Sequence, residues 1–308
     1  MHHNIFADLH NHTQASDGDF SSQALVAKAR EQGIKALGVT DHDTLGGLVA
    51  AVAAGDRAGV EVVPGVEISV RFTRSFFTGT LHVLAYFSRQ RLMDKGFYRR
   101  FTTLLSEGRG DGLVYARIQK INRIFGPGGQ SPLLERELTF EDIAAYSANA
   151  SRRHFALALS RDLGMTDKKT INQIIGNDSP AYLPSGIELE KVGQFLKKEP
   201  VVAVLAHPAA GSFPEKGHYK EVLPPVETVE QLLPEFLSAG IQGLEVYYPG
   251  HSVEHRALLL DWTKRYDLLV TGGSDCHDAS ERPSGACGIG EVGFKKLKEA
   301  IGSRDMEV

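Results

Sequence analysis

Short apolar runs recur along both ends of the chain, and most of them finish at a residue that can bind a metal ion. Their length and composition are typical of β-strands, and patterns of helical spacing separate many of them, as at 21–33, 228–240 and 252–266. Strands that alternate with helices predict a parallel sheet, and seven strands predict a closed or nearly closed α/β barrel. The seven runs lie at residues 5–9, 36–40, 61–66, 81–87, 201–206, 243–248 and 268–272.

The stretch from residue 88 to residue 190 interrupts this alternation. It has apolar residues at helical spacing in 91–107, 113–125, 139–147 and 153–163. We therefore predict a mostly helical insertion between the fourth and fifth barrel strands, which would cap the substrate. The barrel domain would then consist of residues 1–87 and 191–308.

Charge is unevenly distributed between these two parts. Residues 88–127 hold nine Lys or Arg and three Asp or Glu, a net of +6, whereas the whole chain is −4. A basic cap over an acidic barrel would suit an anionic substrate. Helical surfaces are often rich in Lys and Arg in any case, so a solvated face is an equally good interpretation. The overall negative charge argues against binding of long duplex nucleic acid.

The ends of the apolar runs carry the candidate chemistry. His10 and His12 are two residues apart, so their side chains point to the same face of an extended segment and can share one cation. Asp17 follows in the next loop. Within TDHD at 40–43, His42 is the candidate ligand, and Asp41 or Asp43 could accept its second ring N–H.

Four further segments repeat this pattern. Glu67 in PGVEIS is suited to bridging two cations. His82 lies among apolar neighbours and would by itself more often be a hydrogen-bonded core histidine. His207 in LAHPAA directly follows the apolar run at 201–206, and GGSDCH places Asp275 and His277 two residues apart. One or two polar strand ends would be unremarkable, but polar ends on nearly every strand predict a shared site, because barrel chemistry lies at the carboxyl ends of the strands.

These segments, taken in order, resemble the signature blocks of the PHP (polymerase and histidinol phosphatase) superfamily. The blocks are DLHNHTQASDG, LGVTDHDTLGG, VVPGVEIS, LHVLAYF, VLAHP, GLEVYYPGHS and LLVTGGSDCH. The resemblance implies a distorted seven-stranded (β/α)7 barrel that holds two or three divalent ions. Carried over by motif position, it implies nine metal ligands: His10, His12, Asp17, His42, Glu67, His82, His207, Asp275 and His277.

Within the superfamily, the chain is most similar to the bacterial 3',5'-nucleoside bisphosphate phosphatases, some of which act as 5'-to-3' exoribonucleases on short RNA. That group has a helical insertion at the same place and a segment resembling SRRHFALAL at 151–159. Two departures from the group lie near the expected substrate opening. Arg153 stands where a proline is more common, and the loop after His207 is long and rich in Pro and Lys.

The expected reaction is hydrolysis of a phosphate monoester by attack of a metal-bridged hydroxide on phosphorus. Imidazole and carboxylate ligands admit Mn, Fe or Zn, and the many oxygen donors favour Mn or Fe. The candidate catalytic residues are His42, Glu67 and, as a proton donor to the leaving group, Asp43. Arginine binds phosphate through a bidentate fork, so the candidate substrate-binding residues are Arg71, Arg152, Arg153 and His154.

Alternatives remain at two levels. The substrate could be histidinol phosphate or another small phosphomonoester instead of a nucleotide or short RNA. The chain could also be a non-catalytic accessory module, although the intact ligand set weighs against this. With two cysteines, Cys276 and Cys287, and no apolar run of about 20 residues, we expect a cytoplasmic protein without a membrane span. Cys276 is expected to be structural, and His218, His251 and His255 are expected at the surface or at helix caps.

Overall fold

The computed structural model describes residues 5–147, 149–215, 223–280 and 282–306. Its sheet follows one path of seven strands in the order β1-β2-β3-β4-β6-β7-β8, with β5 (Ile187–Glu188) paired to β3 beside that path. The first and last strands nearly meet, because the Leu9 N–H donates to the carbonyl of Gly272 (3.2 Å) and Asn11 bridges to Cys276. The expected distorted seven-stranded barrel is confirmed. Its strands are β1 (Ala7–Asp8), β2 (Ala36–Val39), β3 (Glu61–Arg74), β4 (Phe77–Tyr86), β6 (Val202–Leu205), β7 (Gly243–Tyr247) and β8 (Leu269–Gly272).

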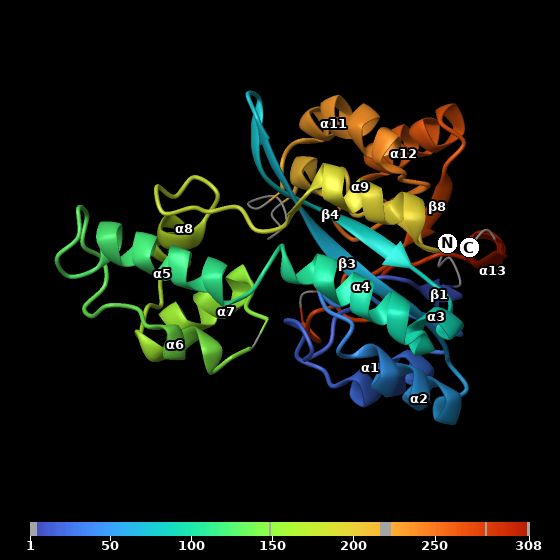
Figure 1. Cartoon of the computed structure of the whole chain (residues 1–308), viewed down its shortest axis with the longest axis horizontal. Coiled ribbons are helices and arrows are strands. Elements are labelled where there is room, and N and C mark those ends of the chain that lie inside the picture. The colour runs from blue at the N-terminus through green and yellow to red at the C-terminus, as the bar shows by residue number, and fades with distance from the viewer. Residues whose placement is uncertain (1–4, 148, 216–222, 281, 307–308) are drawn as a thin grey trace.

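One strand departs from the expected parallel arrangement. β4 runs antiparallel to both β3 and β6, whereas the other pairs along the path are parallel. The reason is the length of the connection: only Ser75 and Phe76 separate β3 from β4, and two residues can join antiparallel neighbours only. Figure 1 shows this long hairpin crossing the molecule.

Helices surround the barrel, and their polar caps set where they begin. The Ser21 hydroxyl accepts the N–H of Ala24 (3.2 Å), which starts the first helix, and Ser252 caps the helix that begins at Val253 in the same way. No helix in the described residues is long and apolar enough to span a membrane. The surrounding helices are α1 (Ser22–Glu31), α2 (Leu48–Ala58), α3 (Arg89–Met93), α4 (Lys95–Ser106), α9 (Leu189–Lys198), α11 (Val226–Ala239) and α12 (Val253–Arg265).

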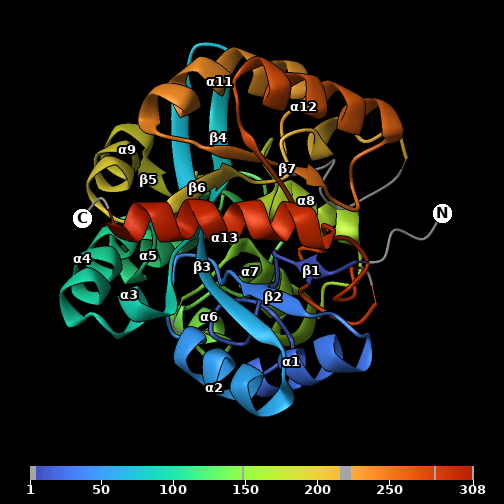
Figure 2. The same cartoon turned by 90° about the vertical axis from the view of Figure 1, so that its right-hand side faces the viewer.

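The last helix, α13 (Glu291–Met306), lies across one end of the barrel (Figure 2). Its apolar residues Phe294, Leu297 and Ile301 form one core cluster with residues that the strands contribute from β1 to β6. This packing closes the end of the barrel that lies opposite the insertion. Access to the centre of the barrel is therefore from the insertion side.

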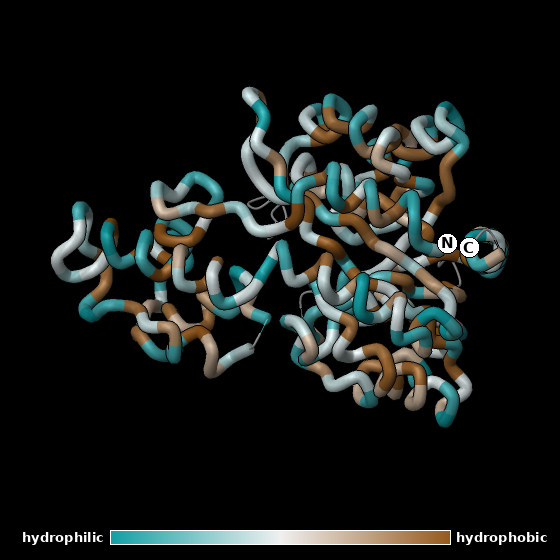
Figure 3. Tube along the Cα trace, viewed as in Figure 1, coloured by the Kyte–Doolittle hydropathy of each residue, from teal (hydrophilic) through white to brown (hydrophobic). Residues whose placement is uncertain are grey.

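The insertion has its own hydrophobic core, separate from that of the barrel. This second core draws on residues from Val114 to Ala181, and Figure 1 shows its helices set to one side of the barrel. Figure 3 shows brown hydrophobic residues among hydrophilic ones along its helices, as expected for amphipathic packing. The helices are α5 (Asp111–Phe125), α6 (Phe140–Ala144), α7 (Arg152–Leu157), which continues into a π-helical turn at Ala158–Asp162, and α8 (Lys168–Ile175).

The beginning of the predicted insertion belongs to the barrel. Phe97 and Phe101 of α4 pack in the barrel core, so the independently packed part is narrower than residues 88–190. Most of the early arginines are also paired on the barrel surface, as in the ion pairs of Arg89 with Asp56 (2.7 Å) and Arg91 with Asp305 (2.8 Å). The net charge of this segment is therefore neutralised in part by the barrel.

Candidate metal centre

The nine candidate ligands converge in one place, and the Glu67 carboxylate lies at its centre. Five histidine ring nitrogens lie within 3.1 Å of its two oxygens; they belong to His10, His12, His42, His82 and His207. Asp17, Asp275 and His277 complete the set from two loops. Three groups have donor atoms close enough to share an ion: His12 with Asp17, His42 and His277; His10 with His12, Glu67 and Asp275; and His42 with Glu67 and His82.

Backbone conformation helps to bring these side chains inward where strands end. Asp43, His207 and Asp275 all adopt positive φ angles, of 50°, 32° and 50°. This region is unfavourable for residues with a Cβ and is retained mainly where the surroundings impose it. Each of the three follows a barrel strand, so the strain coincides with the turns that form the site.

A glycine allows a close approach beside the first ligand. A Cβ on Gly273 would lie 2.4 Å from the backbone nitrogen and the Cβ of His10, which no side chain can do without displacing one of them. The second glycine of GGSDCH is thus required by packing between the ends of β1 and β8.

Several buried polar atoms at this site lack a hydrogen-bond partner among the described residues. They include His10 Nε2, His12 Nδ1, His42 Nδ1, His207 Nδ1, Asp17 Oδ1 and Glu67 Oε2. Leaving so many buried donors and acceptors unsatisfied is costly, and such groups in a folded protein need an explanation. Imidazole nitrogens and carboxylate oxygens in this arrangement fit divalent cations, which would satisfy these atoms.

The electrostatics of the cluster favour ionised carboxylates. Burial alone would raise the pKa of the Glu67 carboxyl, but the neighbouring His42 and His82 outweigh burial and hold that pKa well below its ordinary value. Burial alone would lower the pKa of His10, but Glu67 and Glu245 raise it well above its ordinary value. The carboxylates therefore remain negative at neutral pH, as metal binding requires.

Glu245 is an important residue of this site that sequence reasoning left without a role. It is fully buried in the middle of β7, and its carboxylate accepts from His10 Nδ1 (3.1 Å) and from the backbone N–H of His207 (2.9 Å). A carboxylate on the second ring nitrogen fixes the tautomer and the orientation of a metal-binding histidine. The only sequence signal was the occurrence of a glutamate inside the apolar run GLEVYY.

The Glu245→Gln variant is expected to bind divalent cations about 10- to 100-fold more weakly, because its NH2 group would face an N–H donor of His10 or His207. Titration of metal-free protein with Mn²⁺ measures this affinity. Glu254→Gln, at an exposed position on α12, is the matched control. Equal affinity in the variant and the parent protein would contradict the positioning role of Glu245.

The two aspartates that flank His42 do not hold its ring, contrary to our expectation. Asp41 accepts from the N–H and hydroxyl of Thr13 and from the hydroxyl of Ser16, each at 2.7 Å. It thereby shapes the loop that carries Asp17.

Asp43 has equally strong partners. Its carboxylate accepts from the Ser69 N–H and hydroxyl, both at 2.7 Å, and forms an ion pair with Arg109. Both of its oxygens already accept from fixed donors, so this geometry suits a positioning carboxylate better than a proton donor to the substrate.

The four candidate substrate-binding residues have different surroundings. Arg71 pairs with Glu188 (2.8 Å) at a partly exposed position on β3. Arg152 is directed into the insertion, where it donates to Asn177 (2.7 Å). Arg153 forms ion pairs with Asp19 (3.1 Å) and Asp278, which links α7 to the loops that carry Asp17 and His277.

His154 is buried at the same junction. Its Nδ1 accepts the N–H of Ser151 (2.9 Å), and burial lowers its pKa although the nearby Asp17 acts in the opposite direction. A neutral His154 therefore lies beside the candidate centre, at the contact between the insertion and the barrel.

Two further expectations concern residues around the centre. His251 is buried instead of exposed: it accepts from the Ala209 N–H (3.2 Å) and contacts the Val246 carbonyl (2.9 Å), and burial lowers its pKa to about 3. It thus fixes the loop after His207. His255 has the expected capping role on α12, and His218 lies outside the described residues.

The cysteine next to two candidate ligands is not suited to nucleophilic attack. Burial raises the pKa of the Cys276 thiol to about 12, and its sulfur contacts the Asp278 carbonyl (3.4 Å). A thiol in this state is weakly reactive at neutral pH.

Comparison with known proteins identifies the family. A family model of the PHP domain matches residues 8–160. A phosphoribosyl 1,2-cyclic phosphate 1,2-diphosphodiesterase from Eggerthella lenta is 27% identical over 94% of this chain and 99% of its own. A 5'-3' exoribonuclease from Haemophilus influenzae is 27% identical over 88% of this chain and 89% of its own, and a 3',5'-nucleoside bisphosphate phosphatase from Chromobacterium violaceum is 27% identical over 89% and 88%.

A solved structure agrees with these relatives over nearly the whole chain. It comes from Bifidobacterium adolescentis and is provisionally described as a metal-dependent phosphoesterase. It is 25% identical, covers 97% of both chains and superposes with a TM-score of 0.71. With its buried clusters of metal-binding side chains on this fold, the chain belongs to the PHP superfamily and is a metal-dependent phosphoesterase.

Proposed function

We propose that this enzyme hydrolyses a phosphate monoester on a substrate that carries a second phosphate, with nucleoside 3',5'-bisphosphates as the leading candidates. The nine clustered side chains would hold two or three divalent ions, and their imidazole and carboxylate ligands suit Mn, Fe or Zn. Bound cations would supply the Lewis acidity that activates water and offsets charge on the phosphoryl oxygens. Glu67 orders five histidine rings, and Glu245 and Asp41 fix ligands and loops around them.

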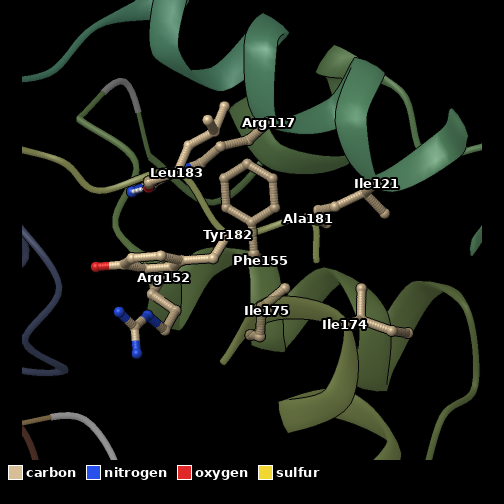
Figure 4. Close-up of a pocket in the computed structure, with 9 residues that line it drawn as sticks. All are labelled: Arg117, Ile121, Arg152, Phe155, Ile174, Ile175, Ala181, Tyr182 and Leu183. Carbon is tan, nitrogen blue, oxygen red and sulfur yellow. Dashed lines mark hydrogen bonds between the residues drawn. The ribbon is translucent and has the colours of Figure 1, made fainter. Parts of the chain in front are cut away.

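The observation that carries the choice of substrate is a pair of partly buried arginines in the insertion. Arg117 and Arg152 line one pocket with Tyr182, and the Arg152 guanidinium lies 5.5 Å from the centre of the Tyr182 ring. Arg117 donates to the Leu183 carbonyl (2.8 Å), and Arg152 Nη1 has no hydrogen-bond partner within the described ranges. In Figure 4, the Arg152 guanidinium and the Tyr182 hydroxyl point away from Ile121 and Ile174.

Two neighbouring positive charges that have no carboxylate partner within the described ranges favour the binding of an anion. Burial lowers the pKa of Arg117 to about 10, and the charge of Arg152 contributes to this shift. Arg153, the next residue after Arg152, contacts the loops that carry Asp17 and His277, and we infer from this that the pocket lies toward the candidate centre. A phosphate bound there would relieve the repulsion and form bidentate hydrogen bonds.

The names of the relatives are consistent with this substrate class. The Chromobacterium enzyme is named for a nucleoside bisphosphate, and the Eggerthella enzyme for a phosphoribosyl cyclic phosphate, so each named substrate joins two phosphates to one sugar. A cyclic phosphodiester is therefore the second candidate, supported by the alignment over 99% of the Eggerthella chain. Short RNA with a 5'-phosphate is a third candidate, in which water would cleave a phosphodiester bond and release a nucleotide.

A panel of four substrates tests the proposal: adenosine 3',5'-bisphosphate, phosphoribosyl 1,2-cyclic phosphate, a short 5'-phosphorylated RNA and histidinol phosphate. We expect kcat/KM for the bisphosphate to exceed that for histidinol phosphate by about 100-fold, equal to about 2.7 kcal/mol of transition-state stabilisation. Released orthophosphate and chromatography of the products measure the rates. The proposal is wrong if only histidinol phosphate turns over, and a preference for the cyclic ester would select the second candidate.

A further inference from the structure

Arg109 is a buried arginine next to the metal centre. It belongs to the connection between α4 and α5, where the chain passes from the barrel to the insertion. Its side chain is only 7% exposed, and it reaches back to form an ion pair with Asp43 and to donate from Nη2 to the Ser69 hydroxyl (3.2 Å). The insertion thus places a positive charge against the barrel.

Glycines permit this path of the chain. A Cβ on Gly108 would lie 2.7 Å from Ile187, and Gly110 has a φ of 127°, which is unfavourable for any other residue. The Gly186 N–H donates to the Gly108 carbonyl (2.9 Å). The segment that enters the insertion and the segment that returns to the barrel are therefore hydrogen-bonded to each other here. Arg109 is therefore held by a tightly packed junction.

The position of Arg109 along β3 relates it to the candidate ligands. Ser69 follows Glu67 by two residues and faces the same side of the strand, and its partner across the ladder is His82. Two residues of a strand span roughly 7 Å. Arg109 therefore contacts β3 two residues beyond Glu67, next to the group formed by His42, Glu67 and His82 and on the side of the insertion.

The ion pair with Asp43 accounts for only part of the hydrogen-bonding capacity of the Arg109 guanidinium. Asp43 already accepts two hydrogen bonds from Ser69, and Arg109 Nη1 remains buried without a hydrogen-bond partner in the described part of the chain. A buried guanidinium N–H without an acceptor is unfavourable unless something else binds it. A phosphoryl oxygen carries the negative charge that a guanidinium N–H binds most strongly.

We propose that Arg109 is a phosphate-binding catalytic residue, which donates to a non-bridging oxygen of the phosphoryl group that is hydrolysed, and that Asp43 and Ser69 position it. This role rests on the proposed function, since it requires a phosphate ester at the metal centre. It gives Asp43 a positioning role in place of proton donation. It also makes the insertion part of the catalytic site, because the connection to the insertion supplies the arginine.

The test measures binding of orthophosphate to the metal-loaded protein by calorimetry, together with metal content and steady-state kinetics. Arg109→Lys keeps the charge but loses the fork. We expect its orthophosphate Kd to rise about 10-fold and its kcat/KM to fall about 100-fold, with unchanged metal content. Arg123→Lys, at an exposed position on α5, is the matched control and should behave like the parent protein.

A second variant guards against loss of folding. Arg109→Met alone would leave Asp43 unpaired, so the double variant Arg109→Met/Asp43→Asn removes both charges together. It should remain folded by circular dichroism, bind metal and bind orthophosphate more weakly than Arg109→Lys. Orthophosphate affinity equal to that of the parent in both variants would overturn the role of Arg109. Absence of turnover in the parent protein, with phosphate binding still dependent on Arg109, would instead count against the proposed function.

Discussion

Replacing Glu67 with glutamine is expected to lower kcat/KM roughly a thousandfold, which corresponds to about 4 kcal/mol. The Glu67 carboxylate lies within 3.1 Å of five histidine rings, so it joins ligands from β1, β2, β4 and β6. Glutamine keeps the shape but loses the negative charge, and its NH2 group cannot ligate a cation. Steady-state hydrolysis of a nucleoside bisphosphate and elemental analysis of the purified variant measure the effect.

Glu61→Gln is a suitable control for this substitution. Glu61 lies on the same strand, but it is exposed and pairs with Lys298 (2.7 Å) at the surface. A surface ion pair contributes at most about 1 kcal/mol to stability, and Glu61 does not contact the site, so activity should be unchanged. If Glu67→Gln retained the activity and metal content of this control, the carboxylate would have no central role.

Removal of metal with a chelator should abolish hydrolysis and lower the melting temperature together. A ligand that binds only the folded state stabilises it by about 2.7 kcal/mol per site when its free concentration is 100 times its Kd. Several buried atoms of this centre lack partners among the described residues, so bound cations should stabilise the folded state by satisfying them. Restoring Mn²⁺, Fe²⁺ or Zn²⁺ separately should recover activity to different extents.

The two readouts distinguish a catalytic metal from a structural one. Assays after dialysis, with elemental analysis of the same samples and calorimetric melting curves, follow both effects. Recovery of the melting temperature without recovery of hydrolysis would indicate a structural ion in a non-catalytic module. Full activity in protein shown to be free of metal would contradict the metal-dependent mechanism altogether.

Much of the centre was predictable because its residues follow local sequence signals. Most candidate ligands lie shortly after an apolar run, and parallel strands bring their carboxyl ends together whatever the distance between them along the chain. The barrel itself followed from the same alternation. The direction of β4 could not be predicted, because an apolar run does not show whether its strand pairs in parallel or antiparallel fashion. Only the two-residue gap at Ser75 and Phe76 indicated a hairpin.

The residues that were missed act through contacts that no local pattern encodes. Glu245 contacts His10, which is 235 positions away along the chain. Arg109, in the first connection to the insertion, forms an ion pair with Asp43 of the barrel. Arg117 was one basic residue among nine in its segment, and only packing separates it from the arginines that pair on the barrel surface. Long-range partners of this kind require the fold.

The position of α13 has a consequence for the catalytic cycle. Because Phe294, Leu297 and Ile301 fill the opposite end of the barrel, substrate and water must arrive through the opening beside the insertion, and both products must leave through it. Under the proposed reaction, orthophosphate would form at the metal centre and would have no rear exit while the dephosphorylated product occupied the front. Product release in a fixed order would then limit turnover, and we expect a smaller leaving group to raise kcat without any change in the bond-breaking step.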